Sequence, residues 1–298
     1  MHSSLRIRQI RIAYLFLLPA IIVFVLGLIV PLINTLELSF NELSMGSPWD
    51  EREFINLENY QRMFSDPGVQ TSVGVTLRFA AFVLIAELVI GLALALLLEK
   101  PIRGAAIFRT IFILPLMVSP VAVGLIWRYL LDGRIGLVNF YLNQIGIPSQ
   151  TWLGEPGLAF FSIVITDIWQ WTPFIFIILL AGLQALPSEV LEASRIDGAN
   201  WWQMTFLIKL PMLRSILLVT VLMRLIDVFR ALEVIFILTF GGPGRSTQVL
   251  SLHIYKTAFT SQALGYASTI AVMLMFIMLI LSMVLMVISN PFKEKSDF

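Results

Sequence analysis

Six long apolar runs alternate with polar segments along the chain. They cover roughly residues 12–33, 72–98, 107–131, 157–185, 213–240 and 264–289. Each run is long enough for a helix to cross the hydrocarbon core of a bilayer, which takes about 20 residues. The pattern predicts an all-α fold, a polytopic membrane protein with six transmembrane helices.

The first run follows a short basic segment that holds Arg6, Arg8 and Arg11. A cleaved signal peptide has a shorter apolar core and a small-residue cleavage site, so we predict a retained first span. Residues 1–71 would comprise the N-terminal tail, this span and a polar external loop. Residues 72–291 would form the transmembrane core, with a cytoplasmic helix at about 187–200.

Composition supports a membrane protein and excludes several classes of site. Hydrophobic residues make up 58% of the chain and charged residues only 13%, with a mean hydropathy of +0.89. Soluble domains are closer to a quarter charged. The net charge of +1 argues against a nucleic-acid partner, and the absence of cysteine excludes disulfides. With His2 and His253 as the only histidines, neither a metal site nor a catalytic group is predicted.

The distribution of basic residues predicts the orientation. With the N-terminus in the cytoplasm, inside segments hold Arg6, Arg8, Arg11, Lys100, Arg103, Arg109, Arg195, Lys209, Arg214, Lys293 and Lys295. Outside segments hold Arg52, Arg62, Arg134, Arg245 and Lys256. Because cytoplasmic loops carry an excess of Lys and Arg, 11 basic residues against 5 place both termini and the segment 186–211 inside.

The segment 186–211 is amphipathic and lies between two strongly apolar runs. Pro187 suits the first turn of a helix, where its missing N–H costs nothing. Asp197-Gly198 would end that helix, because glycine readily takes the left-handed conformation found at helix ends. A second helical run is expected to begin near Asn200 and to stop at Pro211.

The same segment carries a family resemblance. Glu192-Ala193-Ser194, then Gly198, Ile208 and Leu210-Pro211, resembles in order and spacing the EAA motif of the membrane subunits of binding-protein-dependent ABC importers. Ser194 stands where the motif usually has a second alanine. The resemblance implies a type I ABC importer permease fold in which this segment is the coupling helix that docks on a cytoplasmic ATPase. An amphipathic interfacial helix with no partner is the alternative.

The resemblance also implies a role for each residue of the motif. Glu192 would make a polar contact with the ATPase, while Ala193 and Ser194 would let the helix sit deep in its groove. Asp197 and Gly198 would form the turn.

A second motif follows the fifth run. Leu238-Thr239-Phe240-Gly241-Gly242-Pro243 resembles the LTxGGP signature of carbohydrate-importer permeases. No Lys-Ser/Thr follows these glycines and no strand precedes them, so a phosphate-binding loop is rejected. We expect a flexible turn at the outer surface.

The family resemblance implies the rest of the assembly. We expect a second, homologous permease subunit, two copies of the ATPase, an external solute-binding protein and membrane lipid as partners, in a bacterial cytoplasmic (inner) membrane. ATP and Mg²⁺ would be bound by the ATPase, and this chain would bind no cofactor. The solute would be carbohydrate-like: a sugar, oligosaccharide, polyol or glycerol phosphate. The sequence does not choose among these.

Charged residues inside a span usually face a cavity or a partner, because they are costly in lipid. In the fifth run, Arg224, Asp227, Arg230 and Glu233 recur at intervals of three, so neighbours could pair along one helix. One interpretation is a self-neutralised ladder in a subunit interface. The other is that Asp227, Arg230 and Glu233 line a solute pathway.

The fourth run offers further candidates for the pathway. Asp167, Gln170 and Trp171 lie within about one helical turn, and carboxylate, amide and indole groups suit a sugar. The alternative is a packed polar residue beside interfacial tryptophans. Pro173 should kink this helix, and Pro115 with Pro120 should bend the third span. Glu87, alone in the second span, favours a contact between helices over a role in solute binding.

A secondary solute transporter, independent of an ATPase, would also have several spans and buried charges. It would not need an EAA-like cytoplasmic helix. Dependence of uptake on a co-expressed ATPase separates the two functions.

Overall fold

The computed structural model describes residues 16–100 and 103–289, and most of them are helical. The predicted all-α fold is confirmed. The chain divides into two compact units, one of residues 1–66 with 254–273 and one of residues 67–253 with 274–298. The predicted boundary between residues 71 and 72 stays a prediction.

The first unit begins with a helical run from Phe16 to Leu38, whose residues are all exposed or half-buried. Its elements are the π-helical turn η1 (Val25–Ile29), α2 (Val30–Leu38), β1 (Asn41–Glu42), the 3-10 turn η2 (Trp49–Glu51), β2 (Glu53–Phe54), α3 (Glu58–Ser65), the π-helical turn η4 (Lys256–Thr260) and the start of α15 (Leu264–Ser289). β1 and β2 pair antiparallel as a short hairpin. This hairpin is the only sheet in the described part of the chain.

Polar contacts fasten the loop after the first span to α15. The Thr269 hydroxyl donates to the Ser39 carbonyl at 2.9 Å, and the Tyr266 hydroxyl donates to Asp66 at 2.8 Å. The Arg62 guanidinium lies over the Tyr266 ring, 4.1 Å from its centroid. These contacts order a segment that the sequence predicts only as a polar external loop.

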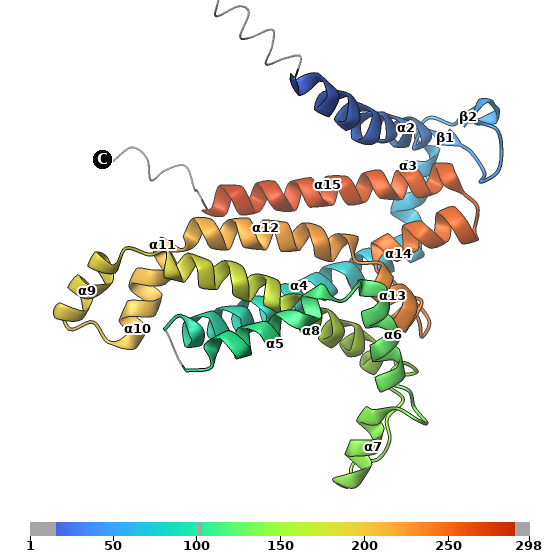
Figure 1. The fold of residues 1–298 in the computed structure, drawn as a ribbon. Helices are drawn as coiled ribbons and strands as arrows, with labels where there is room; N and C mark the ends of the chain where they lie inside the picture. The colour runs from blue at the N-terminus through green and yellow to red at the C-terminus, as the bar shows by residue number, and fades with distance from the viewer. Residues whose placement is uncertain (1–15, 101–102, 290–298) are drawn as a thin grey trace, which may run out of the picture. The chain divides into compact units, whose positions relative to one another are not determined.

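The second unit holds the remaining helices, drawn in Figure 1. They are α4 (Pro67–Leu98), α5 (Ala105–Met117), α6 (Pro120–Leu130), α7 (Leu137–Gln144), α8 (Pro156–Gln184), α9 (Ser188–Ile196), α10 (Trp201–Gln203), the π-helical η3 (Met204–Lys209), α11 (Leu210–Met212), α12 (Arg214–Arg230), α13 (Glu233–Leu238) and α14 (Leu250–Tyr255). α9 and α10 lie at one end of α8 and α12, and α6, α7 and α13 lie toward the other end (Figure 1).

The core of this unit lies between α4 and α8. Its buried side chains are Ala95, Leu98, Ile175, Phe176, Leu179, Leu180, Leu183 and Leu213. Gly91 permits the close approach, because a Cβ at this position would lie 2.8 Å from Cγ2 of Ile175. Small residues serve the same purpose in membrane helix pairs generally, where they let two backbones come close.

The six predicted spans correspond to straight helices and bent pairs. Four helices are long and apolar enough to cross a membrane: Phe16–Leu38, Pro67–Leu98, Pro156–Gln184 and Leu264–Val287. α5 and α6 form a pair bent by 98°, and the run Trp201–Met212 forms a second pair with Arg214–Leu238, bent by 68°. Counting each pair as one span gives six, in agreement with the prediction.

Prolines explain the first bend. Pro115 lies inside α5 and Pro120 opens α6, with the Ser119 side chain accepting a hydrogen bond from the Ala122 N–H as the N-cap. The predicted bend of the third span is therefore confirmed. α8, in contrast, continues past Pro173 without interruption.

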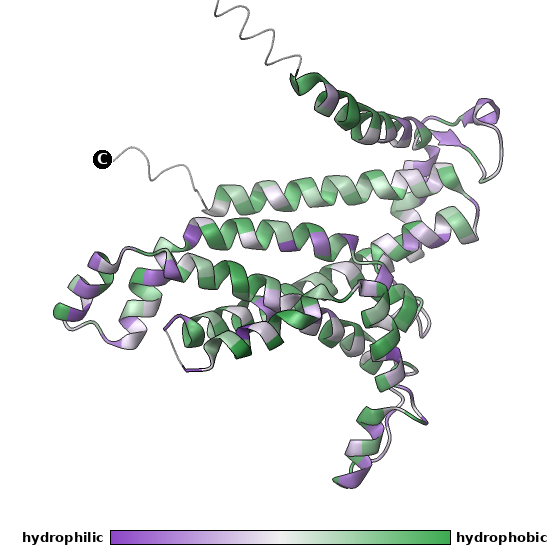
Figure 2. Ribbon diagram, viewed as in Figure 1, coloured by the Kyte–Doolittle hydropathy of each residue, from purple (hydrophilic) through white to green (hydrophobic). Residues whose placement is uncertain are grey.

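The green colouring of Figure 2 follows the spans, and more purple residues gather on α9. The hydropathy pattern on the ribbon therefore matches the apolar runs from which the spans are predicted. α9 is distinct from these spans because it is short and charged.

Candidate functional site

A buried cluster of charges joins three spans in the middle of the second unit. Arg224 of α12 donates from Nε and Nη2 to both carboxylate oxygens of Glu87 in α4, at 2.8 and 2.9 Å. Nη2 also donates to Oδ1 of Asp167 in α8. The three residues are 1%, 0% and 4% exposed. Such charge-assisted, bidentate contacts are the strong class of hydrogen bond, so this triad fixes α4, α8 and α12 to one another.

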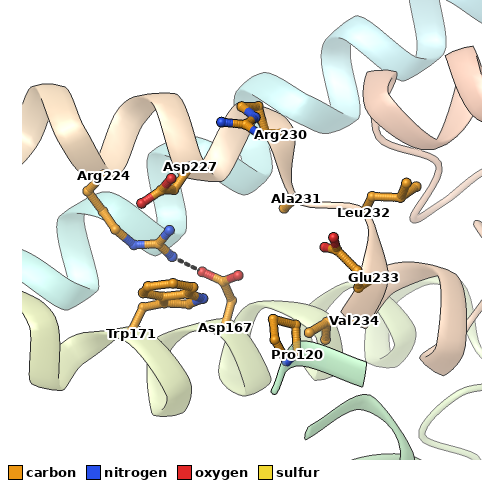
Figure 3. A pocket seen from close by; sticks show the side chains of 10 residues that line it. All are labelled: Pro120, Asp167, Trp171, Arg224, Asp227, Arg230, Ala231, Leu232, Glu233 and Val234. Atoms are coloured by element: carbon orange, nitrogen blue, oxygen red, sulfur yellow. Dashed lines mark hydrogen bonds and ion pairs between the residues drawn. The ribbon is translucent and has the colours of Figure 1, made fainter. Parts of the chain in front are cut away.

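Two residues of the triad, Arg224 and Asp167, line a pocket of about 220 Å³, shown in Figure 3, and Glu87 holds Arg224 without lining the pocket itself. The lining residues are Pro120, Asp167, Trp171, Arg224, Asp227, Arg230, Ala231, Leu232, Glu233 and Val234. The Trp171 ring lies below the Arg224 guanidinium, which is 5.0 Å from the ring centroid. Asp227 and Arg230 come from α12 and Glu233 from α13, so the pocket offers carboxylates, guanidinium groups and an aromatic face.

Five of the six predicted pathway residues meet at this pocket: Asp167, Trp171, Asp227, Arg230 and Glu233. Gln170 does not line it. Its Nε2 donates to the Val118 carbonyl at 3.2 Å, close to the bend between α5 and α6, and its side chain is buried. In the structure this amide therefore supports the bend.

Of the two interpretations of the fifth span, the self-neutralised ladder is not seen in the described residues, where no ion pair joins neighbours along this helix. Arg224 uses its guanidinium on Glu87 and Asp167, which belong to other helices. The helix also ends at Arg230 and restarts at Glu233, with Ala231 and Leu232 outside the helical conformation, so Arg230 and Glu233 are not neighbours on one helix. Glu87 makes the contact between helices that its isolation in the second span favours.

The predicted helix–turn–helix of residues 186–211 is present at the other end of α8. α9 ends in a Schellman motif, in which the Ala199 N–H donates to the Ser194 carbonyl and the Gly198 N–H donates to the Arg195 carbonyl. Gly198 has a φ of +83°, which only glycine takes without strain. Asp197 is the C-cap residue, as the turn requires.

The second helix begins as expected, with a capping box at Asn200. The Asn200 side chain accepts from the Gln203 N–H and the Gln203 side chain accepts from the Asn200 N–H, both at 2.9 Å. Two details of the prediction were wrong. Pro187 is the residue before α9 rather than in its first turn, and the helical run passes through Pro211 to end at Met212. The π-helical hydrogen bonds of η3 shift the bonding pattern just before this proline.

Every residue of α9 is exposed or half-buried, which leaves Glu192 and Ala193 available to a partner. The Ser194 hydroxyl donates to the Val190 carbonyl at 2.7 Å, so its polar group is satisfied within the helix. The aromatic side chains Trp201, Trp202 and Phe206 form an exposed group beside it, in which Trp202 stacks on Phe206.

The glycine-rich motif after α13 forms a hydrogen-bonded turn. Phe240, Gly241 and Gly244 have positive φ values of 49°, 84° and 61°. The buried Thr247 hydroxyl donates to the Gly242 carbonyl at 2.8 Å and lies 2.7 Å from the Thr239 hydroxyl. A turn is present and is held by these side-chain contacts, while its flexibility and its location at the outer surface stay predictions. In residues 16–100 and 103–289 no group of three acidic, histidine or cysteine residues is arranged to hold a metal ion.

Comparison with known proteins identifies the family. The family described as "Binding-protein-dependent transport system inner membrane component" matches residues 63–294, well over half of the chain. The chain belongs to this family. It is therefore a membrane-embedded transport subunit and not an enzyme.

Curated relatives resemble nearly the whole chain. It is 35% identical over 281 residues to the trehalose/maltose transport system permease protein MalF of Thermococcus litoralis, covering 94% of this chain and 93% of the relative. It is 33% identical over 263 residues to the sulfoquinovosyl glycerol transport system permease protein SmoG of Agrobacterium fabrum, covering 88% and 85%.

Solved structures show the same fold. A chain of a bacterial ABC transporter involved in the import of the acidic polysaccharide alginate matches with a TM-score of 0.85 and 23% identity, covering 99% of this chain and 100% of that chain. A second structure of an alginate transporter, in complex with an alginate pentasaccharide-bound periplasmic protein, matches with a TM-score of 0.84. The predicted importer permease fold is confirmed.

Proposed function

We propose that the chain is a permease subunit of an ABC importer for a carbohydrate-like solute and that α9 is its coupling helix. The observation that carries the proposal is the exposed helix α9 between two spans of a chain in the binding-protein-dependent family. It presents Glu192-Ala193-Ser194 and ends at the turn of Asp197 and Gly198. A secondary transporter has no need of such a helix.

The chemistry of the pocket supports a polyhydroxylated solute. Asp227, Arg230 and Glu233 supply hydrogen-bond acceptors and donors, and Trp171 supplies an apolar face. The relatives named for trehalose/maltose and sulfoquinovosyl glycerol transport point to the same chemical class. We propose that solute passes along this pocket, while Gln170 supports the adjoining bend.

The remaining parts of the assembly follow from the proposed function. A second permease subunit would complete the pathway, two ATPase subunits would bind ATP and Mg²⁺, and a solute-binding protein would deliver solute from outside. We propose a bacterial inner membrane as the location, and the excess of basic residues in the predicted inside segments supports a cytoplasmic position for α9 and both termini. Closure of the ATPase pair would then rock the spans between inward- and outward-facing states.

Gly198 provides the test, and Gly146 provides a matched control. Both have a positive φ, +83° and +81°, and a Cβ on either would meet no atom within 4 Å. Gly146 ends α7 with the same pair of hydrogen bonds, because the N–H groups of Ile147 and Gly146 donate to the carbonyls of Leu142 and Asn143. A valine at either site therefore imposes the same local strain at two different ends of the molecule.

The experiment measures co-purification with the ATPase and ATP-driven uptake of labelled maltose, trehalose and longer glucosides in vesicles. Gly198→Val should remain in the membrane and lose ATPase binding and uptake. Gly146→Val should bind the ATPase as the wild type does. Normal uptake by Gly198→Val, or ATPase-independent uptake by the wild type, would refute the assignment.

A further inference from the structure

A second buried ion pair lies where α4 ends. The Lys209 Nζ of η3 lies 2.5 Å from Oε1 of Glu99, the residue that follows α4. The two side chains are only 7% and 14% exposed. By contrast, the pair formed by Arg52 and Glu37 in the first unit is 29% and 43% exposed.

Burying an ion pair is costly, because both charges lose their hydration, and an apolar pair of similar size often gives the same or greater stability. A salt bridge at this position is therefore poorly explained by stability alone. Its location suggests a different role, since Lys209 belongs to the helical run that begins at the capping box of Asn200.

The other side of the pair is α4, which also carries Glu87. Twelve residues separate Glu87 from Glu99, which is about 18 Å along a helix. Glu87 holds Arg224 in the pocket wall, so one helix connects Lys209 to the candidate solute pathway. The end of α4 is also held by Arg109 of α5, whose Nη2 donates to the Leu98 carbonyl at 2.6 Å.

α9 itself has no buried side chain that could fix it to the spans as Lys209 fixes η3, since all its residues are exposed or half-buried. In η3, Met204, Thr205 and Lys209 are buried. A force applied to α9 reaches the spans by two connections: residues 185–187, which join it to α8, and the turn at Gly198, which joins it to η3. Of the buried side chains of η3, Lys209 is the one that makes an ion pair with the end of another span.

We propose that Glu99 and Lys209 are positioning residues that make the α9–η3 segment and the end of α4 move as one body, so that motion at the coupling helix reaches Glu87 and the pocket. This inference rests on the proposed function, because it takes α9 to be the coupling helix and says how its motion is transmitted to the spans. Neither residue contacts solute in this scheme. Their role is to hold two elements in a fixed relation during the transport cycle.

The test uses the complete transporter with its partner permease, ATPase and solute-binding protein in proteoliposomes. The double variant Glu99→Leu/Lys209→Met replaces the ion pair by an apolar pair. We expect it to assemble and to hydrolyse ATP in response to loaded binding protein, while the amount of maltose carried per ATP falls about fivefold or more, the lower range of typical coupling effects. The charge-swapped variant Glu99→Lys/Lys209→Glu should recover part of this ratio.

Spin labels give a readout that a purely structural role would not change. The chain contains no cysteine, so labels attach to this subunit only where Leu97→Cys and Ile196→Cys introduce one, and it is labelled before assembly with its partners. Both positions are exposed, at 64% and 86%. The distance between the labels should stay constant through the ATP cycle in the wild type and should change with nucleotide state in the apolar double variant.

Two results would overturn the inference. In the first, the apolar variant carries as much maltose per ATP as the wild type and keeps a constant distance between the labels. In the second, both double variants fail to assemble, which would make the ion pair a folding contact. Either failure is distinguishable from failure of the proposed function. If α9 is not the coupling helix, Gly198→Val leaves ATPase binding intact whatever the Glu99 variants do.

Discussion

The buried triad of Arg224, Glu87 and Asp167 yields a quantitative prediction. Arg224→Met removes the guanidinium that neutralises two carboxylates buried to 0% and 4% exposure. Breaking a buried ion pair from one side costs about 3–5 kcal/mol, because the remaining charge is left desolvated and unpaired. In a protein of this size about 1 kcal/mol corresponds to about 2–4 °C in midpoint temperature, so a loss of about 6–20 °C is expected.

Asp167→Asn provides the matched comparison. An asparagine Oδ1 can still accept from Nη2 of Arg224, and the two hydrogen bonds between Arg224 and Glu87 are unaffected. This change also removes the excess negative charge of two carboxylates on one guanidinium. We therefore expect a loss below about 1 kcal/mol.

The assay is the midpoint of thermal aggregation of the detergent-solubilised complex, followed by size-exclusion chromatography. Arg230→Met is the control for loss of an arginine from the same helix, because Arg230 is exposed and makes no ion pair among the described residues. It should change stability by less than about 0.5 kcal/mol. If Arg224→Met is no less stable than Arg230→Met, the triad does not hold the three spans together.

Two further predictions concern packing and capping. Gly91→Ala should destabilise the complex by about 1–3 kcal/mol in the same thermal assay, because the new Cβ would lie 2.8 Å from Ile175 Cγ2. Gly74→Ala, on the same helix with nothing within 4 Å of the new Cβ, should be neutral or stabilising. Asn200→Ala should cost about 1 kcal/mol by removing the side-chain cap, and amide exchange at Gln203, whose N–H donates to the Asn200 side chain, should speed up about fivefold. Unchanged exchange would mean that the cap does not order this turn.

The sequence predicts the spans well because each span depends on a long apolar run, which the bilayer requires. Breaks are less predictable. Pro115 and Pro120 reveal the bend of the third span, since proline disrupts a helix by removing a donor. The interruption after Arg230 occurs at Ala231 and Leu232, two residues with high helix propensity, so no local signal marks it.

The candidate site shows the same limit. The regular spacing of Asp227, Arg230 and Glu233 in the sequence identifies them as candidates for the solute pathway, and all three line the pocket. The partners of Arg224 depend instead on how α4 and α8 are rotated about their axes and how deep they lie. The spacing of residues along one helix carries no information about either. The sequence offers one clue. Glu87 is the only charged residue in the middle of its span, so a basic side chain that neutralises it has to come from another helix.

The charge balance of the pocket leads to a prediction about the solute. Asp167, Asp227 and Glu233 line the pocket together with only two arginines, Arg224 and Arg230. A fourth carboxylate, Glu87, lies against Arg224. Carboxylates outnumber guanidinium groups around the pocket, so we expect the pocket to favour a neutral solute over an anion. A neutral sugar or polyol should therefore be carried in preference to a glycerol phosphate.

The comparison is competition for uptake of labelled maltose by unlabelled glycerol 3-phosphate and by unlabelled trehalose, with the solute-binding protein present. Trehalose should compete at least about tenfold better, which corresponds to about 1.4 kcal/mol. Replacing Glu233 by Gln should narrow that difference, because it removes a negative charge from the pocket wall without removing an acceptor. Equal competition by the phosphate ester would mean that the partner permease supplies the positive charge, and that the acidic residues of this subunit serve mainly to hold Arg224 and the adjoining helices in place.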